Sequence, residues 1–210
     1  MLSKMIDAQY RRPSGLLGRW IGSRMARDHR AENLWTLSIL EAQPTDQVLE
    51  IGFGPGFAVQ ELARVVTQGR IAGVDFSGTI LAAARRCNAA AIRRGLVDLH
   101  RADAARLPFE EASFDKAFSI HSIYFWPRPL DALKEAWRVL RPGAMLILTV
   151  LPKEKWNEDD PSAPVGTPQC TPYSGEELLD LFSKAGFVRS RIRSDSNPAH
   201  RSNYSVVGIK

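Results

Sequence analysis

The sequence predicts an α/β protein with three layers, in which helices cover both faces of a mostly parallel sheet. Strand-like and helix-like segments alternate from residue 47 to residue 187, the order that builds parallel strands joined by crossover helices. A glycine-rich turn joins the first of these strands to the helix that follows it. The last two strand-like segments have no helix between them, so one of the two is expected to run antiparallel.

The predicted strands are short apolar runs bounded by turn residues. In chain order they are residues 47–51, 69–75, 98–102, 114–121, 144–151, 188–193 and 204–209. The run 144–151 has the strongest strand character, and 98–102 has the weakest.

The predicted helices lie between these strands, except for one that precedes them. They are residues 29–41, 58–66, 78–94, 131–140 and 174–185. Ser174 with Glu176 and Glu177 after it is a typical helix start, and Pro142-Gly143 stops the preceding helix. Residues 152–172 are too many for a plain connector. We expect this loop, with Trp156, to be the main determinant of substrate identity.

Length and composition indicate one globular unit. A chain of 210 residues with 44% hydrophobic content can bury a core without disulfides. Cys87 and Cys170 lie in no Cys/His spacing, so neither a disulfide nor a metal site is expected. The free thiols, and the lack of an apolar run near 20 residues or of a secretory signal, favour a cytoplasmic location. We divide the chain into a helical arm, 1–44, and a main domain, 45–210.

The positive charge is concentrated in the N-terminal arm. The net charge is +5, and arginines alternate with apolar residues between Leu16 and Met25, as in a basic amphipathic helix. Three interpretations stay open: a lid over the substrate pocket, a weak membrane-surface contact, or an ordinary packed helix. No RNA-binding motif accompanies the charge, so a nucleic-acid partner is not expected.

The strongest functional signal is the turn after the first predicted strand, Glu50-Ile51-Gly52-Phe53-Gly54-Pro55-Gly56. Glycines let a ligand approach the backbone closely, and the following helix directs its free N–H groups at the same point. Asp75 ends the next strand, where a carboxylate can bind both hydroxyls of a ribose. Asp103 ends the third strand, where it can accept a hydrogen bond from an adenine amino group. Together these residues predict a nucleotide site.

The same segments resemble the motifs of class I S-adenosylmethionine-dependent methyltransferases. The similarity covers about residues 45–150, in five segments that keep the family order: 50–56, 74–77, 102–109, 114–119 and 140–144. The resemblance extends to the small-molecule and quinone-type C- and O-methyltransferases. It implies a Rossmann-like sheet of seven strands, with the last strand inserted antiparallel.

The resemblance also implies a role for each matching residue. Glu50 and the turn residues Gly52, Phe53, Gly54 and Gly56 would line the methionine end of the cofactor. Asp75 would hold the ribose, and Phe76 would lie against the adenine. Asp103 and the Ala104 amide would bind the adenine edge, and Ser119 would lie beneath the sulfonium. Phe53 and Pro55 depart from the family, which often has small residues between these glycines.

Methyl transfer needs an aligned acceptor and, where the acceptor is protonated, a base. His121 is the histidine that the family pattern places near the transferred methyl, and Tyr124 is a second candidate catalytic residue. His121 either acts as a general base or only shapes the pocket. Phe125 and Trp126 either form an apolar wall or belong to the core. No Asn/Asp-Pro-Pro-aromatic string follows the fourth strand, which disfavours nucleobase amino groups as acceptors.

The sequence therefore predicts methyl transfer from S-adenosylmethionine to a small, partly apolar acceptor, giving S-adenosylhomocysteine, by a monomer or homodimer. Two alternatives remain. An NAD(P)-dependent oxidoreductase is disfavoured because Phe57 stands where a dinucleotide motif would have its last glycine. A non-catalytic S-adenosylmethionine-binding protein would carry the same cofactor residues.

Overall fold

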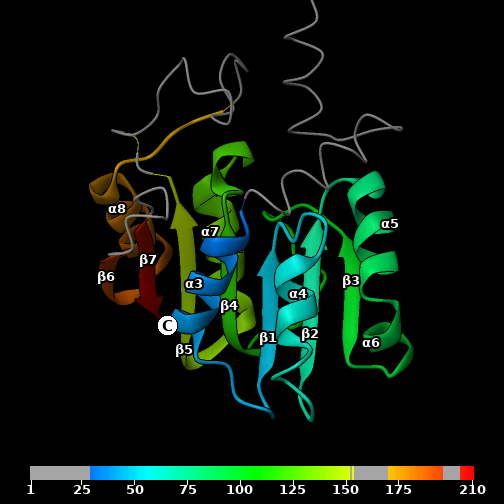
Figure 1. The fold of residues 1–210 in the computed structure, drawn as a ribbon. Helices are drawn as coiled ribbons and strands as arrows, with labels where there is room; N and C mark the ends of the chain where they lie inside the picture. Colours follow the sequence, from blue (N-terminus) through cyan, green and yellow to red (C-terminus); the bar gives the residue numbers. More distant parts are fainter. Residues whose placement is uncertain (1–28, 152, 154–169, 196–203) are drawn as a thin grey trace, which may run out of the picture.

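The computed structural model describes residues 29–151, 153, 170–195 and 204–210. The predicted helix of the basic arm and the loop segment that contains Trp156 lie outside these residues. The described chain forms one seven-stranded sheet in the order β3-β2-β1-β4-β5-β7-β6 (Figure 1). Strand β7 pairs antiparallel with both β5 and β6, and the other neighbouring strands are parallel. The predicted fold, including the inserted antiparallel strand, is confirmed.

The observed strands agree closely with the predicted ones. They are β1 (Gln47–Ile51), β2 (Arg70–Asp75), β3 (Val97–Arg101), β4 (Phe114–Ile120), β5 (Leu140–Val150), β6 (Val188–Ser194) and β7 (Tyr204–Ile209). The largest difference is at β5, which begins at Leu140, directly after the preceding helix. Leu140 already pairs with Phe114, and the register then shifts before Met145 pairs with Lys116. The Pro142-Gly143 segment is therefore an irregularity within β5, not a separate turn.

The described helices are α3 (Arg30–Leu40), α4 (Phe57–Leu62), α5 (Gly78–Cys87), α6 (Ala89–Arg93), α7 (Pro129–Val139), α8 (Gly175–Ala185) and the short 3-10 helix η1 (Ile123–Phe125). Ser174 caps α8 in the predicted way, with a reciprocal capping box to Glu177. The predicted helix 78–94 is instead divided at Asn88 into α5 and α6. The buried Asn88 amide donates to the carbonyl oxygens of Gly56 and Ala84, each at 3.0 Å, and so ties this break to the glycine turn.

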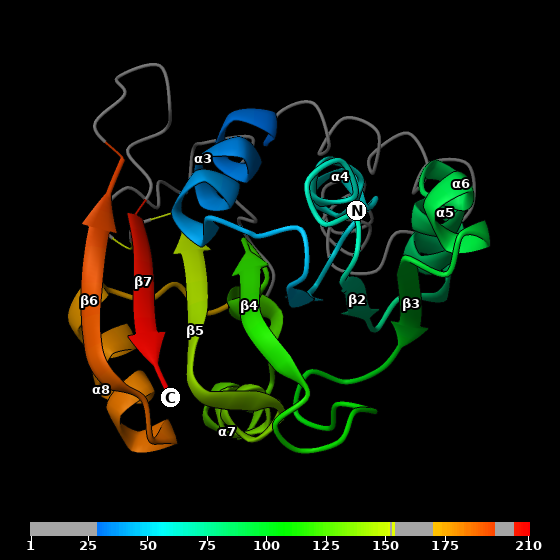
Figure 2. The same ribbon diagram turned by 90° about the horizontal axis from the view of Figure 1, so that it is seen from below.

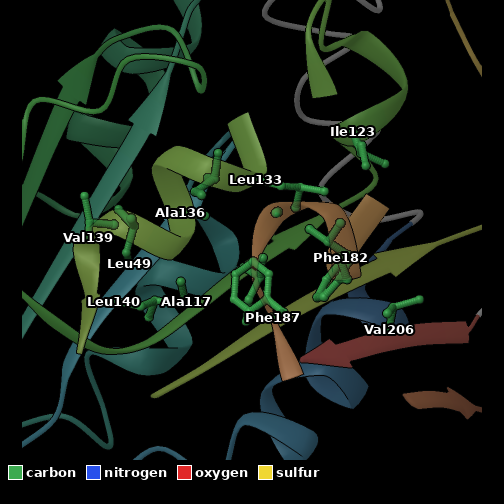
Figure 3. Close-up of a cluster of buried hydrophobic side chains, with 14 of the residues drawn as sticks. Leu49, Ala117, Ile123, Leu133, Ala136, Val139, Leu140, Phe182, Phe187 and Val206 are labelled. Atoms are coloured by element: carbon green, nitrogen blue, oxygen red, sulfur yellow. The ribbon is translucent and has the colours of Figure 1, made fainter. Parts of the chain in front are cut away.

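The helices form two layers. Viewed along the strands, α3, α4, α5 and α6 cover one face of the sheet, while α7 and α8 cover the other (Figure 2). Adjacent residues of each strand enter opposite cores: Val48 packs toward α3 and α4, and Leu49 packs toward α7. Figure 3 shows the second core, where Leu133, Ala136 and Phe182 meet the sheet residues. Because the sheet is covered on both faces, β1, β2 and β4 each contain at least four successive buried residues.

Helix α3 is fixed to the sheet by a buried chain of hydroxyl groups. Thr36 Oγ1 lies 2.6 Å from Thr149 Oγ1 in β5, which lies 2.7 Å from Ser205 Oγ in β7. All three side chains are fully buried, so each bond is made in a low-dielectric environment. These bonds hold the middle of α3 against β5 and β7.

In the part of the chain that the structure describes, no helix is long and apolar enough to cross a membrane. Cys87 is exposed, and Cys170 is partly buried.

Candidate active site

A cavity of about 290 Å³ opens at the carboxyl ends of the parallel strands, the edge to which the arrowheads of β1, β2 and β4 point in Figure 1. Ligands bind at this edge in open α/β sheets. We call the part that follows β1, β2 and β3 the β2 side; its lining includes Glu50, Gly52, Phe53, Gly54, Asp75, Phe76, Asp103 and Ala104. The part formed by the start of α3 and the end of β4 is the β4 side; its lining includes His29, Asn33, Ile120, His121, Ser122, Phe125 and Trp126.

The glycine turn has a backbone that side chains would not tolerate. Gly52 and Gly56 have φ values of 81° and 85°, in the left-handed region that favours glycine. A Cβ on Gly52 would lie 2.5 Å from Ser122, and one on Gly56 would lie 2.6 Å from the Asn88 amide. Gly54 differs, because a Cβ there would meet no atom within 4 Å, so its open side faces the cavity. The turn therefore leaves room for a ligand at Gly54 and is packed tightly elsewhere.

The bulky Phe53 is accommodated by a second glycine. Its side chain is buried in the core between the sheet and α4, and a Cβ on Gly73 of β2 would lie 2.7 Å from its ring. Gly73 thus provides the space for Phe53. This pairing explains how the turn tolerates a large residue between its glycines.

Asp75 connects the end of β2 to the glycine turn. Its carboxylate accepts hydrogen bonds from the backbone N–H groups of Gly54 at 3.2 Å and Ser77 at 2.9 Å. Burial nevertheless raises the pKa of Asp75 from 3.8 to about 6, because the two N–H donors compensate only in part for desolvation. The site therefore holds an acceptor-rich side chain poised for a hydroxyl or amino donor.

Glu50, at the end of β1, is the most strongly perturbed acid. Its side chain is 2% exposed, and its Oε2 atom has no hydrogen-bond partner among the described residues. Desolvation and then the nearby Asp75 charge raise the pKa of Glu50 from 4.5 to about 8. A buried carboxylate oxygen without a partner at the cavity wall fits a cationic or donor-bearing ligand group, such as the ammonium of a bound amino acid.

Asp103 and Ala104 lie at the open end of the β2 side. Asp103 Oδ1 accepts the Ala105 N–H at 2.9 Å, while its Oδ2 is 3.8 Å from Arg128. Phe76, a cavity-lining residue, is 41% exposed, which is unusual for a phenylalanine and leaves a ring face available. A flat aromatic group could stack here beside a hydrogen-bonding edge.

The structure places three predicted site residues behind the cavity wall. Gly56, Ser119 and Tyr124 are not among the residues that line it. Ser119 is buried, and its Oγ lies 2.8 Å from Ser122 Oγ, which in turn donates to the Ile51 carbonyl at 3.2 Å. Ser119 therefore helps to fix the end of β4 to the end of β1, and Ser122 is its neighbour that reaches the cavity.

His121 is held in a strained turn immediately after β4. Its φ is 50°, and its N–H donates to the Thr149 carbonyl at 2.9 Å. His121 Nδ1 lies 3.3 Å from the Tyr124 hydroxyl, which also bonds the Leu151 backbone. Burial raises the pKa of Tyr124 well above its usual value, so this phenol stays neutral. A backbone outlier at a cavity wall is where functional strain is expected.

Several cavity residues were not identified from the sequence. His29 and Asn33 line the β4 side but belong to no contiguous motif. Phe125 and Trp126, whose place in wall or core was left open, both line the cavity. A helix was predicted over residues 29–41, but nothing in the sequence showed which end of it would meet β4.

Comparisons with known proteins agree with this geometry. Residues 49–148 match the family described as "Methyltransferase domain". The chain is 29% identical to the uncharacterized methyltransferase YdaC of Bacillus subtilis, covering 78% of this chain and 83% of that protein. It is 32% identical to the O-methyltransferase resE of Aspergillus sclerotiorum, over 70% of this chain and 57% of that protein. The chain thus spans little more than half the length of that fungal enzyme.

Among solved structures, a Thermotoga maritima SAM-dependent methyltransferase, described as a possible histamine N-methyltransferase, superposes with a TM-score of 0.66 at 26% identity. That match covers 90% of this chain and 94% of the other. The fold agrees with that of this neighbour, and S-adenosylmethionine is the cofactor. The chain belongs to the class I S-adenosylmethionine-dependent methyltransferases.

Proposed function

We propose that the protein transfers the methyl group of S-adenosylmethionine to a small, partly apolar acceptor that binds on the β4 side. The observation that carries the proposal is one continuous cavity with two chemically different sides. The β2 side offers buried carboxylates and open glycine backbone. The β4 side offers an imidazole between aromatic side chains, which suits an acceptor with an apolar body and one polar group.

On the β2 side, Glu50 would hold the ammonium of the cofactor and Asp75 its ribose hydroxyls. The backbone of Gly54 would lie against the cofactor, and Phe76, Asp103 and Ala104 would bind the adenine. The cofactor supplies an electrophilic methyl group on a sulfonium, so the chemistry needs little activation by the protein. The unpaired Oε2 of Glu50 and the open side of Gly54 support this placement.

On the β4 side, the chain would align the acceptor and receive its proton. His121 lines the cavity, and we propose that its imidazole takes the proton of an acceptor hydroxyl or amine. Tyr124 lies behind His121 and would position its ring. Phe125 and Trp126 would exclude water from the reacting groups.

The first test is thermal unfolding with S-adenosylhomocysteine, S-adenosylmethionine and NADH in parallel, for wild type and Asp75→Ala. A ligand present at a hundred times its dissociation constant adds about 2.7 kcal/mol to the free energy of unfolding. We expect a rise with the two adenosyl ligands that Asp75→Ala loses, and no rise with NADH. A rise with NADH alone would overturn the proposal.

The second test separates catalysis from mere binding. Release of S-adenosylhomocysteine is measured against a panel of small phenols, alcohols, amines and acidic carbon compounds. Turnover with one of them supports the proposal, and His121→Ala should then lower kcat by about 100-fold or more. Tight cofactor binding with no turnover across the panel would favour a non-catalytic binding protein.

The arm keeps its three predicted interpretations, as a lid, a membrane-surface contact or an ordinary packed helix, and the 152–172 loop keeps its predicted role as the determinant of substrate identity. Vesicles of anionic lipid at low salt test the membrane-surface interpretation of the arm, because the full chain must then sediment with the vesicles. Cytoplasmic location and the oligomeric state remain predictions.

A further inference from the structure

Three metal-ligating side chains meet on the β4 side, away from the glycine turn. They are His29, Glu32 and His121, and one ligand atom from each lies within 4.8 Å of the other two. The imidazole centroids of His29 and His121 are 4.8 Å apart, with the rings tilted by 46°. His29 and Glu32 are three residues apart at the start of α3, so they share one side of the helix.

Glu32 has the character of an incomplete ion pair. Its side chain is 2% exposed although it lies in the first turn of a surface helix. Its Oε2 atom is buried and has no hydrogen-bond partner among the described residues. A buried carboxylate oxygen costs several kcal/mol unless a cation or donor compensates it. The two imidazoles are the nearest groups with which it could share a cation.

We propose that His29, Glu32 and His121 bind a divalent transition-metal ion, for which Zn²⁺ is the best match. Two imidazoles and one carboxylate form a ligand set typical of catalytic zinc, whereas Mg²⁺ and Ca²⁺ prefer oxygen ligands alone. Ligands at about 2.0–2.2 Å from a tetrahedral zinc ion lie roughly 3.3 Å from one another. Shifts of about an ångström in side-chain position therefore suffice to close the site around the ion.

The scaffold around the three ligands is rigid enough to hold such a site. The Thr36–Thr149–Ser205 chain fixes α3 on the sheet one turn after Glu32. Thr36 Oγ1 also donates to the Glu32 carbonyl at 2.8 Å. His121 is fixed by its own backbone turn and by its bond to Thr149, the same residue that anchors α3. Hydrogen bonds that hold the ligating residues in place help to orient metal ligands.

The ion would have an open coordination position toward the acceptor. His29 and His121 both line the cavity, whereas Glu32 lies behind them. This step rests on the proposed function: an acceptor hydroxyl bound to the ion would lose its proton to water more readily, leaving a metal-bound oxygen anion. Acceptors with a hydroxyl or carboxylate beside an apolar body are then favoured. His121 would act as a ligand in this case, and the metal would replace it as the activating group.

The test is a zinc titration of the metal-stripped full-length protein, without an affinity tag, in competition with a chromogenic chelator. We expect one Zn²⁺ per chain. Glu32→Gln and His121→Asn should each weaken binding by at least about 100-fold, the upper end of what loss of an outer-shell partner costs. His100→Asn is the matched control, because His100 lies on β3 beside Asp98 and outside the cluster. It should bind zinc like the wild type.

Folding and ligation are separated by a second measurement. Each variant is tested for stabilisation by S-adenosylhomocysteine, which reports an intact β2 side, and for the visible absorption of bound Co²⁺. A variant that is still stabilised by S-adenosylhomocysteine but no longer shows the Co²⁺ absorption supports the metal site. Absence of stoichiometric zinc in wild type, or equal affinity in Glu32→Gln, overturns it. If the protein binds zinc but transfers no methyl group, the proposed function alone is overturned. If the protein contains no zinc and its turnover is unaffected by chelators, the metal site alone is overturned.

Discussion

The two sides of the cavity are built in different ways. The β2 side is made from residues that follow consecutive strands, and its key contacts are local: Asp75 binds the N–H groups of Gly54 and Ser77. The β4 side joins the start of α3 to the end of β4, two segments far apart in the sequence. The first side suits a fixed, charged ligand, and the second can change with the acceptor. Under the proposed function, cofactor recognition and acceptor choice are therefore expected to be separable in this chain.

The largest effect is expected at Gly52, where the two sides touch. Gly52→Ala would place a Cβ 2.5 Å from Ser122 in a left-handed backbone. We expect a loss of about 2–4 kcal/mol in the free energy of unfolding, measured by urea denaturation. Gly95→Ala is the control, since its φ is 74° but a Cβ there meets nothing within 4 Å. Equal losses for the two variants would show that the sides are not in tight contact at Gly52.

Asp75→Asn tests the β2 side alone. Removing the charged acceptor should weaken S-adenosylhomocysteine binding by about 100-fold, because hydrogen bonds to a charged group contribute about 1.5–3 kcal/mol each. Calorimetric titration measures the affinity, and Asp98→Asn on the neighbouring strand serves as the control. Zinc affinity should stay within about threefold of wild type. A matching loss of zinc binding would contradict the separation of the two sides.

Glu50→Gln should stabilise the ligand-free protein and weaken the binding of the cofactor. The pKa of Glu50 is raised to about 8, so the unfolded chain loses this proton above about 4.5 while the folded chain keeps it. Stability therefore falls as pH rises from about 4.5 to about 8, and Gln removes this penalty. We expect a gain of about 1–2 kcal/mol at pH 8 and almost none at pH 4, from denaturation curves at both values. A destabilised variant at pH 8 would show that the carboxylate has a partner in the folded state.

The smallest effect concerns the pH dependence of cofactor affinity. A bound ammonium favours the ionised form of Glu50, so binding should release a proton where the free site is protonated. The affinity for S-adenosylhomocysteine should rise by about three- to tenfold between pH 6.5 and 8. Calorimetry in two buffers of different ionisation enthalpy measures the released proton. Glu50→Gln should flatten this dependence, leaving only the smaller contribution of Asp75, whose pKa is about 6.

The sequence was most informative where structure depends on neighbours along the chain. The carboxyl ends of the strands, the glycine turn and the Ser174 cap are local; the strand ends lie within about one residue of their predicted positions, and the turn and the cap lie where they were predicted. Helix 78–94 was predicted without its break, because Asn88 is explained only by the distant Gly56 carbonyl that it binds. The His29–Glu32–His121 cluster was missed, and no metal was expected, because no spacing in the sequence joins two residues of α3 to one that follows β4.

The inserted position of β7 also affects the order in which parts of the fold can form during synthesis. Strand β7 is the last segment of the chain, yet it pairs with β5 in the sheet interior and carries Ser205, the end of the hydroxyl chain that begins on α3. A nascent chain can form β1, β2, β3 and β4 early, but the α3 anchor closes only once β7, which follows the other described elements in the sequence, has been synthesised. We therefore expect the β2 side to acquire hydrogen-exchange protection first, and the β4 side to be ordered in the last step of folding.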